Sequence, residues 1–426
     1  MLQHMWIWLL LGACMGTETP SASEAVAPDV PAAPAAPSPP PPPANPAKHA
    51  VLIVIDTLRA DAMAKAATPN LDALAARGDA VERAWSAGTW TVPSVVSLLT
   101  GMPVRQHGWD LPTGRIGSYP PLPETPTIAT VLKEAGFGTY GVYANPYLAE
   151  QLGFDRGFET WKRSVDRAMP EHFGKHVAAD WGDGRRHFAY IHLIGPHSPL
   201  KPSEEARARW NIEPSWFDDK RGLGIGPAKR DQEPGVREAY AAAYHAVIED
   251  TDVRIGQLVA ALGEHRDETV ILVVSDHGEM LGEHDKVGHG RMLYEPLTNV
   301  PFLSDRGSLP KTLGIASAPA VLTGHLGVAH AWPTPADAAL PLVSQREGRL
   351  ALSPDGSLKG IWEEDTLTAY DLSADPSEQS PLSETDSLTA ARAAWTDTVP
   401  PGVLTDESVS LHPDTIEALK AMGYLQ

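Results

Sequence analysis

Acidic residues and a histidine follow two apolar segments that lie far apart in the sequence. The run 49–56, HAVLIVID, ends on Asp56, and the run 268–279, ETVILVVSDHGE, places Asp276 and His277 directly after its apolar stretch. Either aspartate alone is an ordinary helix cap or turn former. Together with the histidine they form a mixed oxygen and nitrogen donor set, which suits Zn²⁺, Mn²⁺ or Mg²⁺ better than the all-oxygen cage of Ca²⁺. The sequence therefore predicts a divalent-metal site.

Thr91 lies in the stretch 88–101, GTWTVPSVVSLLTG, two residues before Pro93, and this position predicts the start of a helix. Its hydroxyl could cap the helix, fill space, or attack a substrate. A helix N-terminus favours negative charge, because its backbone N–H groups and its dipole point toward the ligand. A metal ion beside the hydroxyl would lower its pKa and make it a nucleophile. Taken alone, this stretch leaves the capping and the catalytic interpretations open.

Buried parallel strands are the elements that must position these residues. The two apolar runs are uninterrupted, which predicts strands covered on both faces. Helix start and stop signals predict helices over 68–78 and 125–137, and an amphipathic pattern predicts a long one over 236–262. Strands that alternate with helices indicate an α/β fold with a mostly parallel central sheet sandwiched by helices. Ligands gather at the carboxyl ends of such strands, so we expect the two aspartates and the histidine at one edge.

The last part of the chain predicts a smaller antiparallel unit. Residues 346–372 contain short β-like runs separated by Asp355-Gly356, a strong hairpin signal. Residues 373–400 are polar and predict a surface excursion, and the segment DTIEALKAMGYL that follows predicts a closing helix. We expect a catalytic α/β domain over 49–305 and a small C-terminal α+β subdomain over 306–426.

Composition limits the partners of the chain. Of its 426 residues 42% are hydrophobic, which is enough for a substantial core. Lys and Arg number 34 against 54 Asp and Glu, and the net charge of -20 argues against nucleic acid as a partner. The single cysteine excludes a disulfide within the chain.

The N-terminal segment predicts export. The apolar run before Cys14 is shorter than the ~20 residues that span a bilayer, and it is typical of an export signal over 1–14. Its Leu-Gly-Ala-Cys ending resembles the bacterial lipoprotein box, which implies lipidation at Cys14. The Pro/Ala-rich segment 15–48 has too little apolar surface to fold and predicts a disordered tether. We expect a lipid-anchored protein of the bacterial cell envelope, periplasmic or at the cell surface. A buried N-terminal helix with an incidental cysteine is the alternative.

Motifs along the chain resemble, in order, those of the sulfatase family within the alkaline-phosphatase superfamily. They are VLIVIDTLRADAM (51–63), TPNLDALAARG (68–78), WTVPSVVSLLTGMPVRQHG (90–108), YIHLIGPHSPL (190–200), VVSDHGEMLGEHDKVGHGRMLYEPLTNVPFL (273–303), AYDLSADPSE (369–378) and the terminal LKAMGYLQ. The resemblance runs from about residue 49 to 426 and is weak from about 304 to 350.

The resemblance implies roles by position. It implies metal ligands at Asp56, Thr91, Asp276 and His277, with Thr91 also the nucleophile. It implies that His197 and His289 face the anionic group of the substrate, that one of them protonates the leaving oxygen, and that His289 stands where many sulfatases have lysine. His192 and His284 are weaker candidates for substrate binding.

The departures from the family pattern decide which chemistry is expected. Sulfatases carry Cys-x-Pro-Ser-Arg, or a serine variant, whose first residue is oxidised to formylglycine. Here the pattern is Thr91-Val92-Pro93-Ser94-Val95, and Thr57 replaces the second aspartate. Threonine is not a substrate for that maturation, so no formylglycine is expected. The same arrangement occurs in phosphodiesterases, phosphoethanolamine transferases and lipoteichoic-acid synthases of the superfamily, which form a covalent phospho-enzyme on threonine.

The sequence thus predicts a metal-dependent hydrolase that cleaves a phosphate, phosphonate or sulfate ester of a small molecule, glycan or lipid. Two alternatives remain open. One is an envelope head-group transferase, which the lack of a multi-span membrane segment weakens. The other is a degenerate lipoprotein that uses the fold only for binding, which the losses at Thr57 and Val95 motivate.

Overall fold

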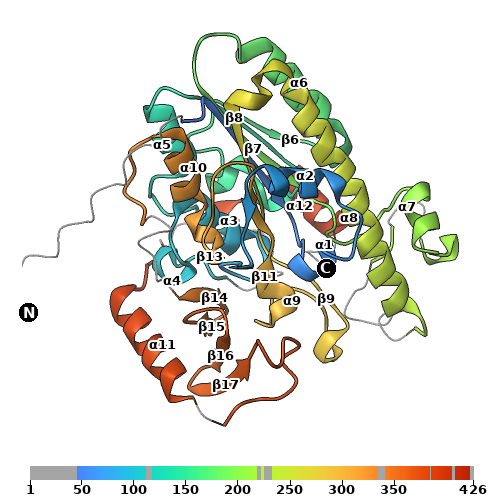
Figure 1. Cartoon of the computed structure of the whole chain (residues 1–426), viewed down its shortest axis with the longest axis vertical. Helices are drawn as coiled ribbons and strands as arrows, with labels where there is room; N and C mark the ends of the chain where they lie inside the picture. Colours follow the sequence, from blue (N-terminus) through green and yellow to red (C-terminus); the bar gives the residue numbers. More distant parts are fainter. Residues whose placement is uncertain are drawn as a thin grey trace, which may run out of the picture. The chain divides into compact units, whose positions relative to one another are not determined.

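A seven-stranded sheet forms the centre of the structure, a computed structural model (Figure 1). The structure describes residues 46–111, 118–217, 222–224, 233–333, 341–383, 385–404 and 408–422. All of them belong to one unit, Pro39–Gln426. Cys14 and residues 15–45 of the predicted tether lie outside the described residues. In the described ranges no helix combines the length and the apolar character needed to cross a membrane.

The central sheet is mostly parallel. Its strands, in spatial order, are β2 (Asp79–Ala80), β12 (Phe302–Ser304), β8 (Thr269–Ser275), β1 (His49–Ile55), β7 (His187–Leu193), β5 (Gly138–Tyr143) and β6 (Thr160–Arg163). β1 pairs in parallel with β8 from His49↔Thr269 to Ile55↔Ser275, and with β7 up to Ile55↔Leu193. β12 runs antiparallel to β8, and β2 runs antiparallel to β12. The two-residue β2 is the outermost strand on this side of the sheet.

Helices cover both faces of this sheet (Figure 1). Side chains of β1 alternate: Ala50, Leu52 and Val54 enter one core with residues of α3 (Thr91–Thr100), α5 (Ile128–Glu134) and α10 (Ala318–Leu326). The intervening Val51, Ile53 and Ile55 enter a second core with residues of α2 (Pro69–Arg77), α6 (Met169–Asp180) and α8 (Val236–Ala261). Because both faces of β1 are buried, its unbroken apolar run is explained. The predicted fold class is confirmed.

Smaller elements surround the sheet. The short helices are α1 (Ala60–Met63), α4 (Val104–His107), α7 (Glu204–Arg209), α9 (Glu295–Thr298) and α12 (Pro413–Ala421). The short strands are β3 (Arg83–Trp85), β4 (Ser118–Tyr119), β9 (Met280–Leu281), β10 (Val287–Gly288), β11 (Asn299–Val300), β13 (Thr312–Gly314) and β18 (Val409–Ser410). β13 pairs with β3, and α10 packs in the first core.

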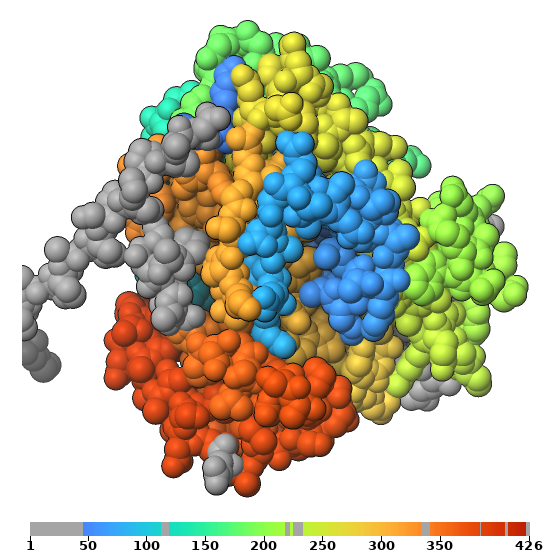
Figure 2. Space-filling model, in the orientation of Figure 1, coloured from blue at the N-terminus to red at the C-terminus, as the bar shows by residue number. Residues whose placement is uncertain are grey.

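The C-terminal unit is a four-stranded antiparallel sheet of β14 (Leu342–Arg346), β15 (Arg349–Ser353), β16 (Leu358–Glu363) and β17 (Thr366–Asp371). Its residues, orange to red, lie together at the lower end of the view in Figure 2. Asp355-Gly356 lies in the predicted turn between β15 and β16, with Gly356 at φ 87°.

One helix falls where the composition predicts a surface excursion. α11 (Asp386–Thr398) lies on the antiparallel sheet and buries Leu388 and Trp395 against it. The spacing of Leu388, Ala391 and Trp395 places them on one helical face, so an apolar stripe of helical period was present in a segment of polar average.

Candidate active site

Three predicted metal ligands meet at the carboxyl edge of the central sheet. Asp56 follows β1, and Asp276 and His277 follow the adjacent β8. One donor atom from each lies within 4.8 Å of the others, and all three side chains are buried. His277 Nε2 lies 3.6 Å from Asp56 Oδ1 and 3.7 Å from Asp276 Oδ2. The parallel register of the two strands accounts for this meeting.

Each of these residues directs one unsatisfied atom into the cluster. Asp56 Oδ1, Asp276 Oδ2 and His277 Nε2 are buried and have no hydrogen-bond partner. The other atoms are satisfied: Asp276 Oδ1 accepts from the backbone N–H of Thr57 and of His277, and His277 Nδ1–H donates to the Gly278 carbonyl at 2.9 Å. His277 Nε2 therefore presents a lone pair. A buried unsatisfied polar atom costs ~1–3 kcal/mol. A divalent cation bound by all three atoms would remove this cost, so the donor set fits such a cation.

The electrostatics of the cluster agree with a cation. Burial raises the pKa of Asp276 well above its usual value, and the neighbouring Asp56 carboxylate raises it further. Burial also lowers the pKa of His277, which keeps the imidazole in the neutral form that binds metals. Two buried carboxylates and a neutral imidazole are unfavourable together without a positive charge between them.

Thr91 is the first residue of α3, and its hydroxyl faces this cluster. Thr91 Oγ1 lies 3.5 Å from Asp56 Oδ2, and the side chain is fully buried. The N-cap of α3 is Trp90, and no side chain makes a capping hydrogen bond there. The capping interpretation of Thr91 is therefore wrong. Because the helix begins at Thr91, the hydroxyl lies at the N-terminal end of α3, where the backbone N–H groups of the first turn have no partner within the helix.

Asn145 belongs to the same constellation, although the sequence analysis missed it. Its amide Nδ2 donates to Asp56 Oδ2 at 2.7 Å and to Thr91 Oγ1 at 3.0 Å, while its Oδ1 accepts from the Tyr147 N–H. Asn145 follows β5 at the same edge of the sheet. The strand-end rule applied to Asp56 and Asp276 would have found it. Because the amide donates to the Thr91 oxygen, it stabilises a negative charge on that oxygen.

Replacing Asn145 with alanine is expected to lower kcat by ~10²–10³-fold, the range found when one preorganised donor to a developing oxyanion is removed. Asn145→Asp keeps the shape but places a carboxylate beside Asp56, so we expect at least as large a loss. Steady-state kinetics with a thermal unfolding control measures both effects. An Asn145→Ala protein with wild-type kcat would contradict this role.

Histidines surround the cluster on its remaining sides. His192, in β7, is fully buried; its Nε2–H points to Asp56 Oδ2 at 3.4 Å, and Tyr190 holds its Nδ1 at 2.8 Å. The His289 ring lies 4.5 Å from the His277 ring and 5.0 Å from the His197 ring. His289 is 13% exposed, whereas the metal-ligand candidates are inaccessible, so the site opens at His197 and His289.

The two histidines at the opening differ in electrostatics. Burial lowers the pKa of His197. Burial opposes the charging of His289 as well, but Glu279, whose carboxylate lies 3.2 Å from His289 Nδ1, outweighs it and raises the pKa. Glu279 is itself buried and was not predicted from the sequence. His289 is thus better suited than His197 to carry a proton that it can donate.

Three further positions considered in the sequence either lie away from the metal-ligand candidates or direct no side-chain atom toward them. His284 stacks on Tyr294 at 3.8 Å, and the contacts described for it do not reach the cluster. The Thr57 hydroxyl donates to the Asp56 carbonyl, and the Thr57 backbone has φ 61°. Val95 is a core residue. At the position of the family aspartate, Thr57 therefore makes a backbone hydrogen bond, and at the position of the family arginine, Val95 packs in the core.

A second histidine group lies at the opposite edge of the sheet. His49, His265 and Glu268 also offer donor atoms within 4.8 Å of one another. However, His49 Nδ1 accepts the His187 backbone N–H at 3.1 Å, so its proton sits on the Nε2 that faces the group. A protonated nitrogen cannot bind a metal, and this group does not fit one.

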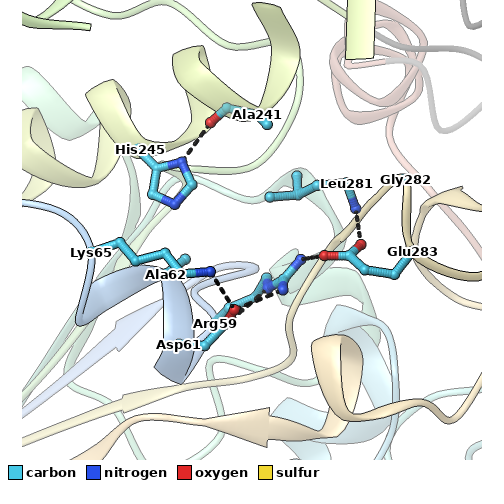
Figure 3. A pocket seen from close by; sticks show the side chains of 9 residues that line it. All are labelled: Arg59, Asp61, Ala62, Lys65, Ala241, His245, Leu281, Gly282 and Glu283. Carbon is cyan, nitrogen blue, oxygen red and sulfur yellow. Dashed lines mark hydrogen bonds and ion pairs between the residues drawn. The ribbon is translucent and has the colours of Figure 1, made fainter. Parts of the chain in front are cut away.

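A pocket of about 310 Å³ adjoins the site but holds none of the predicted site residues (Figure 3). Its central cation, Arg59, donates to Asp61 at 2.8 Å and to Glu283 at 2.7 Å. Lys65 also pairs with Asp61. Since the carboxylates match the cations in number, the pocket offers no net charge to an anionic group.

Comparisons with known proteins identify related sequences. The family model described as Sulfatase matches residues 48–318. An arylsulfatase of Clostridium perfringens strain 13 is 26% identical over 341 residues, covering 61% of this chain and 69% of that protein.

Solved structures share the fold at low identity. A phosphonate monoester hydrolase of Agrobacterium radiobacter aligns with a TM-score of 0.64 and 18% identity, over 83% of this chain and 94% of that one. A 2-O GAG sulfatase aligns with a TM-score of 0.63 and 17% identity, over 83% and 91%.

Proposed function

The chain belongs to the sulfatase family, a family of ester hydrolases, and from this premise we propose that it cleaves a phosphate, phosphonate or sulfate ester with Thr91 as an unmodified nucleophile. The observation that carries the proposal is the position of the Thr91 hydroxyl. It lies 3.5 Å from Asp56 and 3.0 Å from the Asn145 amide, beside three unsatisfied donor atoms. The chain has no cysteine in this region that could become formylglycine.

Asp56, Asp276 and His277 are the residues that would hold a divalent cation. Their oxygen and nitrogen donors favour Zn²⁺, Mn²⁺ or Mg²⁺ over Ca²⁺. When bound, the cation supplies positive charge that favours ionised Thr91 and stabilises the charge developing on the transferred group. Asn145 and the first-turn N–H groups of α3 add fixed donors.

The proposed reaction has two displacements. In the first, the Thr91 oxygen, whose proton has passed to solvent, bonds to phosphorus or sulfur while the bond to the leaving oxygen breaks, and His289 gives its proton to that oxygen. In the second, water attacks the covalent intermediate, His289 takes a proton from the water, and the Thr91 oxygen leaves. His289 suits the proton transfer because Glu279 raises its pKa and because it lies at the opening of the site.

The decisive experiment combines metal removal with a substrate panel. The full chain is dialysed against a chelator, and Zn²⁺, Mn²⁺, Mg²⁺ or Ca²⁺ is restored singly before assays on aryl phosphate monoesters, phosphodiesters, phosphonate monoesters and sulfate esters. We expect chelation to abolish hydrolysis and one of the first three metals to restore it. Asp276→Asn should not be restored at the same metal concentration. Full activity without a divalent metal, or a metal-loaded protein inactive on every ester class, would overturn the proposal.

A further inference from the structure

The C-terminal antiparallel sheet reaches the nucleophile segment through its first strand. In β14 the Gln345 N–H donates to the Ala87 carbonyl at 2.9 Å, and Gln345 forms a parallel bridge with Gly88. These contacts lie a few residues before Thr91. The adjacent residue, Arg346, ends the strand and is fully buried.

Arg346 contacts two segments that carry proposed catalytic groups. Its guanidinium lies over the Trp90 ring, 5.3 Å from the centroid, and Trp90 directly precedes Thr91. Its Nε–H donates to the Gly290 carbonyl at 2.7 Å, and Gly290 directly follows His289. One side chain therefore touches the neighbour of the nucleophile and the neighbour of the proposed proton donor.

The remaining donors of Arg346 fix its position. One amino group donates to Asp110 at 2.9 Å and to the Leu111 carbonyl at 2.8 Å, and the other donates to Glu347 at 2.7 Å. Both carboxylates are less than a third exposed. A planar guanidinium can satisfy these diverging acceptors at once, whereas the single ammonium of lysine cannot.

The contact with Trp90 extends to a third segment. Trp90 packs edge-on against Tyr147 with centroids 5.4 Å apart, and the Tyr147 N–H is held by Asn145 Oδ1. The chain of contacts from Arg346 through Trp90 and Tyr147 thus ends at the amide that donates to Thr91.

We propose that Arg346 is a positioning residue that couples the C-terminal sheet to catalysis by orienting the Thr91 and His289 segments. The role rests on the proposed function. It acts through other residues, because its donors are directed at Gly290, Leu111, Asp110 and Glu347. A displacement of about 1 Å at a reacting group can cost ~10²-fold in rate, so such a brace affects catalysis from a distance.

The test compares leaving groups. Arg346→Met is assayed on a series of aryl esters whose leaving phenols span a range of pKa. Because proton donation matters most for poor leaving groups, we expect kcat/KM to fall ~10–100-fold for the most basic phenols and much less for the most acidic ones. The dependence of rate on leaving-group pKa then becomes steeper, as it should in His289→Ala. The double variant should be far from additive.

Two further variants keep the result decisive. Arg392→Met removes an arginine of α11 that lies over the Trp362 ring and donates to the Glu364 carbonyl, neither of which contacts Arg346, and it should change kcat/KM less than ~2-fold. Arg346→Lys keeps the charge and should show an intermediate loss with the same leaving-group trend. If Arg346→Met fails to fold, the leaving-group series is measured with Arg346→Lys instead.

Equal losses for all leaving groups, or additive effects with His289→Ala, would show that Arg346 does not orient the His289 segment and would overturn the proposal that it couples both segments, while leaving the hydrolase intact. Absence of wild-type activity toward every ester would instead overturn the proposed function. Millimolar methylguanidine is a further readout: it should restore part of the activity of Arg346→Ala, because it can occupy the vacated donor position. A purely structural contribution elsewhere in the sheet predicts no such rescue.

Discussion

Thr91→Ala is expected to lower kcat/KM by at least ~10³-fold while leaving the protein folded, since loss of a nucleophile removes most of the catalytic advantage of such a site. The unfolding free energy should change little. Thr91 is not the cap of α3, so the ~0.5–2 kcal/mol that a lost cap costs does not apply. The measurement is steady-state kinetics on the best ester of the panel, with thermal unfolding in parallel.

Thr89→Ala provides the matched control. Thr89 lies two residues upstream, is equally buried, and its hydroxyl has no hydrogen-bond partner. Removing an unpaired buried hydroxyl is close to neutral, so kcat/KM should stay within ~2-fold of wild type. Thr91→Ser keeps a hydroxyl at the reacting position and should retain covalent chemistry.

A covalent intermediate gives a second readout. Rapid quenching during turnover, followed by digestion and mass spectrometry, should find a phosphoryl, phosphonyl or sulfuryl group on the peptide that contains Thr91. Thr91→Ser should carry it on the serine. A Thr91→Ala protein that keeps a tenth or more of wild-type activity, or an adduct on another residue, would show that the nucleophile is elsewhere.

The strand-end ligands were predictable from sequence because a parallel sheet brings all its carboxyl ends to one edge. The apolar runs before Asp56 and Asp276 determine strand type and direction, and proximity follows from topology. The same reasoning reaches Asn145, but β5 carries glycine, threonine and tyrosine in place of an unbroken aliphatic run, and its strand end was not recognised.

Contacts between separate layers could not be derived from sequence pattern. Arg346 lies in a segment where the family resemblance is weak, and its meeting with Trp90 and Gly290 depends on how β14 docks beside Ala87. Glu279 was overlooked because a lone glutamate after a metal-ligand motif has no distinctive spacing. The lipidation of Cys14 and the domain boundary at 305 remain predictions.

A buried ion network joins the C-terminal sheet to the segment before β11. Lys359 of β16 is fully buried; its Nζ lies 3.1 Å from Glu295 and 2.8 Å from Glu378, and it stands over the Trp85 ring at 4.8 Å. Glu378 closes the motif AYDLSADPSE and also accepts the Glu295 backbone N–H. The terminal glutamate of that motif therefore has a structural task in this chain.

Lys359→Met is expected to lower the unfolding free energy by ~3–5 kcal/mol, because it leaves two largely buried carboxylates without their shared cation. Arg83, 2.5 Å from Glu295, still pairs with that carboxylate, so the unpaired charge falls mainly on Glu378. Lys311→Met is the matched control: its pair with Glu82 is exposed and should contribute less than ~1 kcal/mol. Denaturant unfolding at pH 7 measures both variants.

The loss in Lys359→Met should shrink as the pH falls. Burial already raises the pKa of Glu378, and removing Lys359, which opposes that shift, raises it further. The folded variant then binds a proton more tightly than the unfolded chain, so its stability increases as the pH falls through the range between the unfolded and folded pKa values and decreases as the pH rises.

Adding Glu378→Met should recover part of the loss at pH 7, since an apolar pair replaces a lone buried charge. A Lys359→Met protein within ~1 kcal/mol of wild type at pH 7, or one whose deficit is the same at every pH, would show that the network contributes no more than an exposed ion pair.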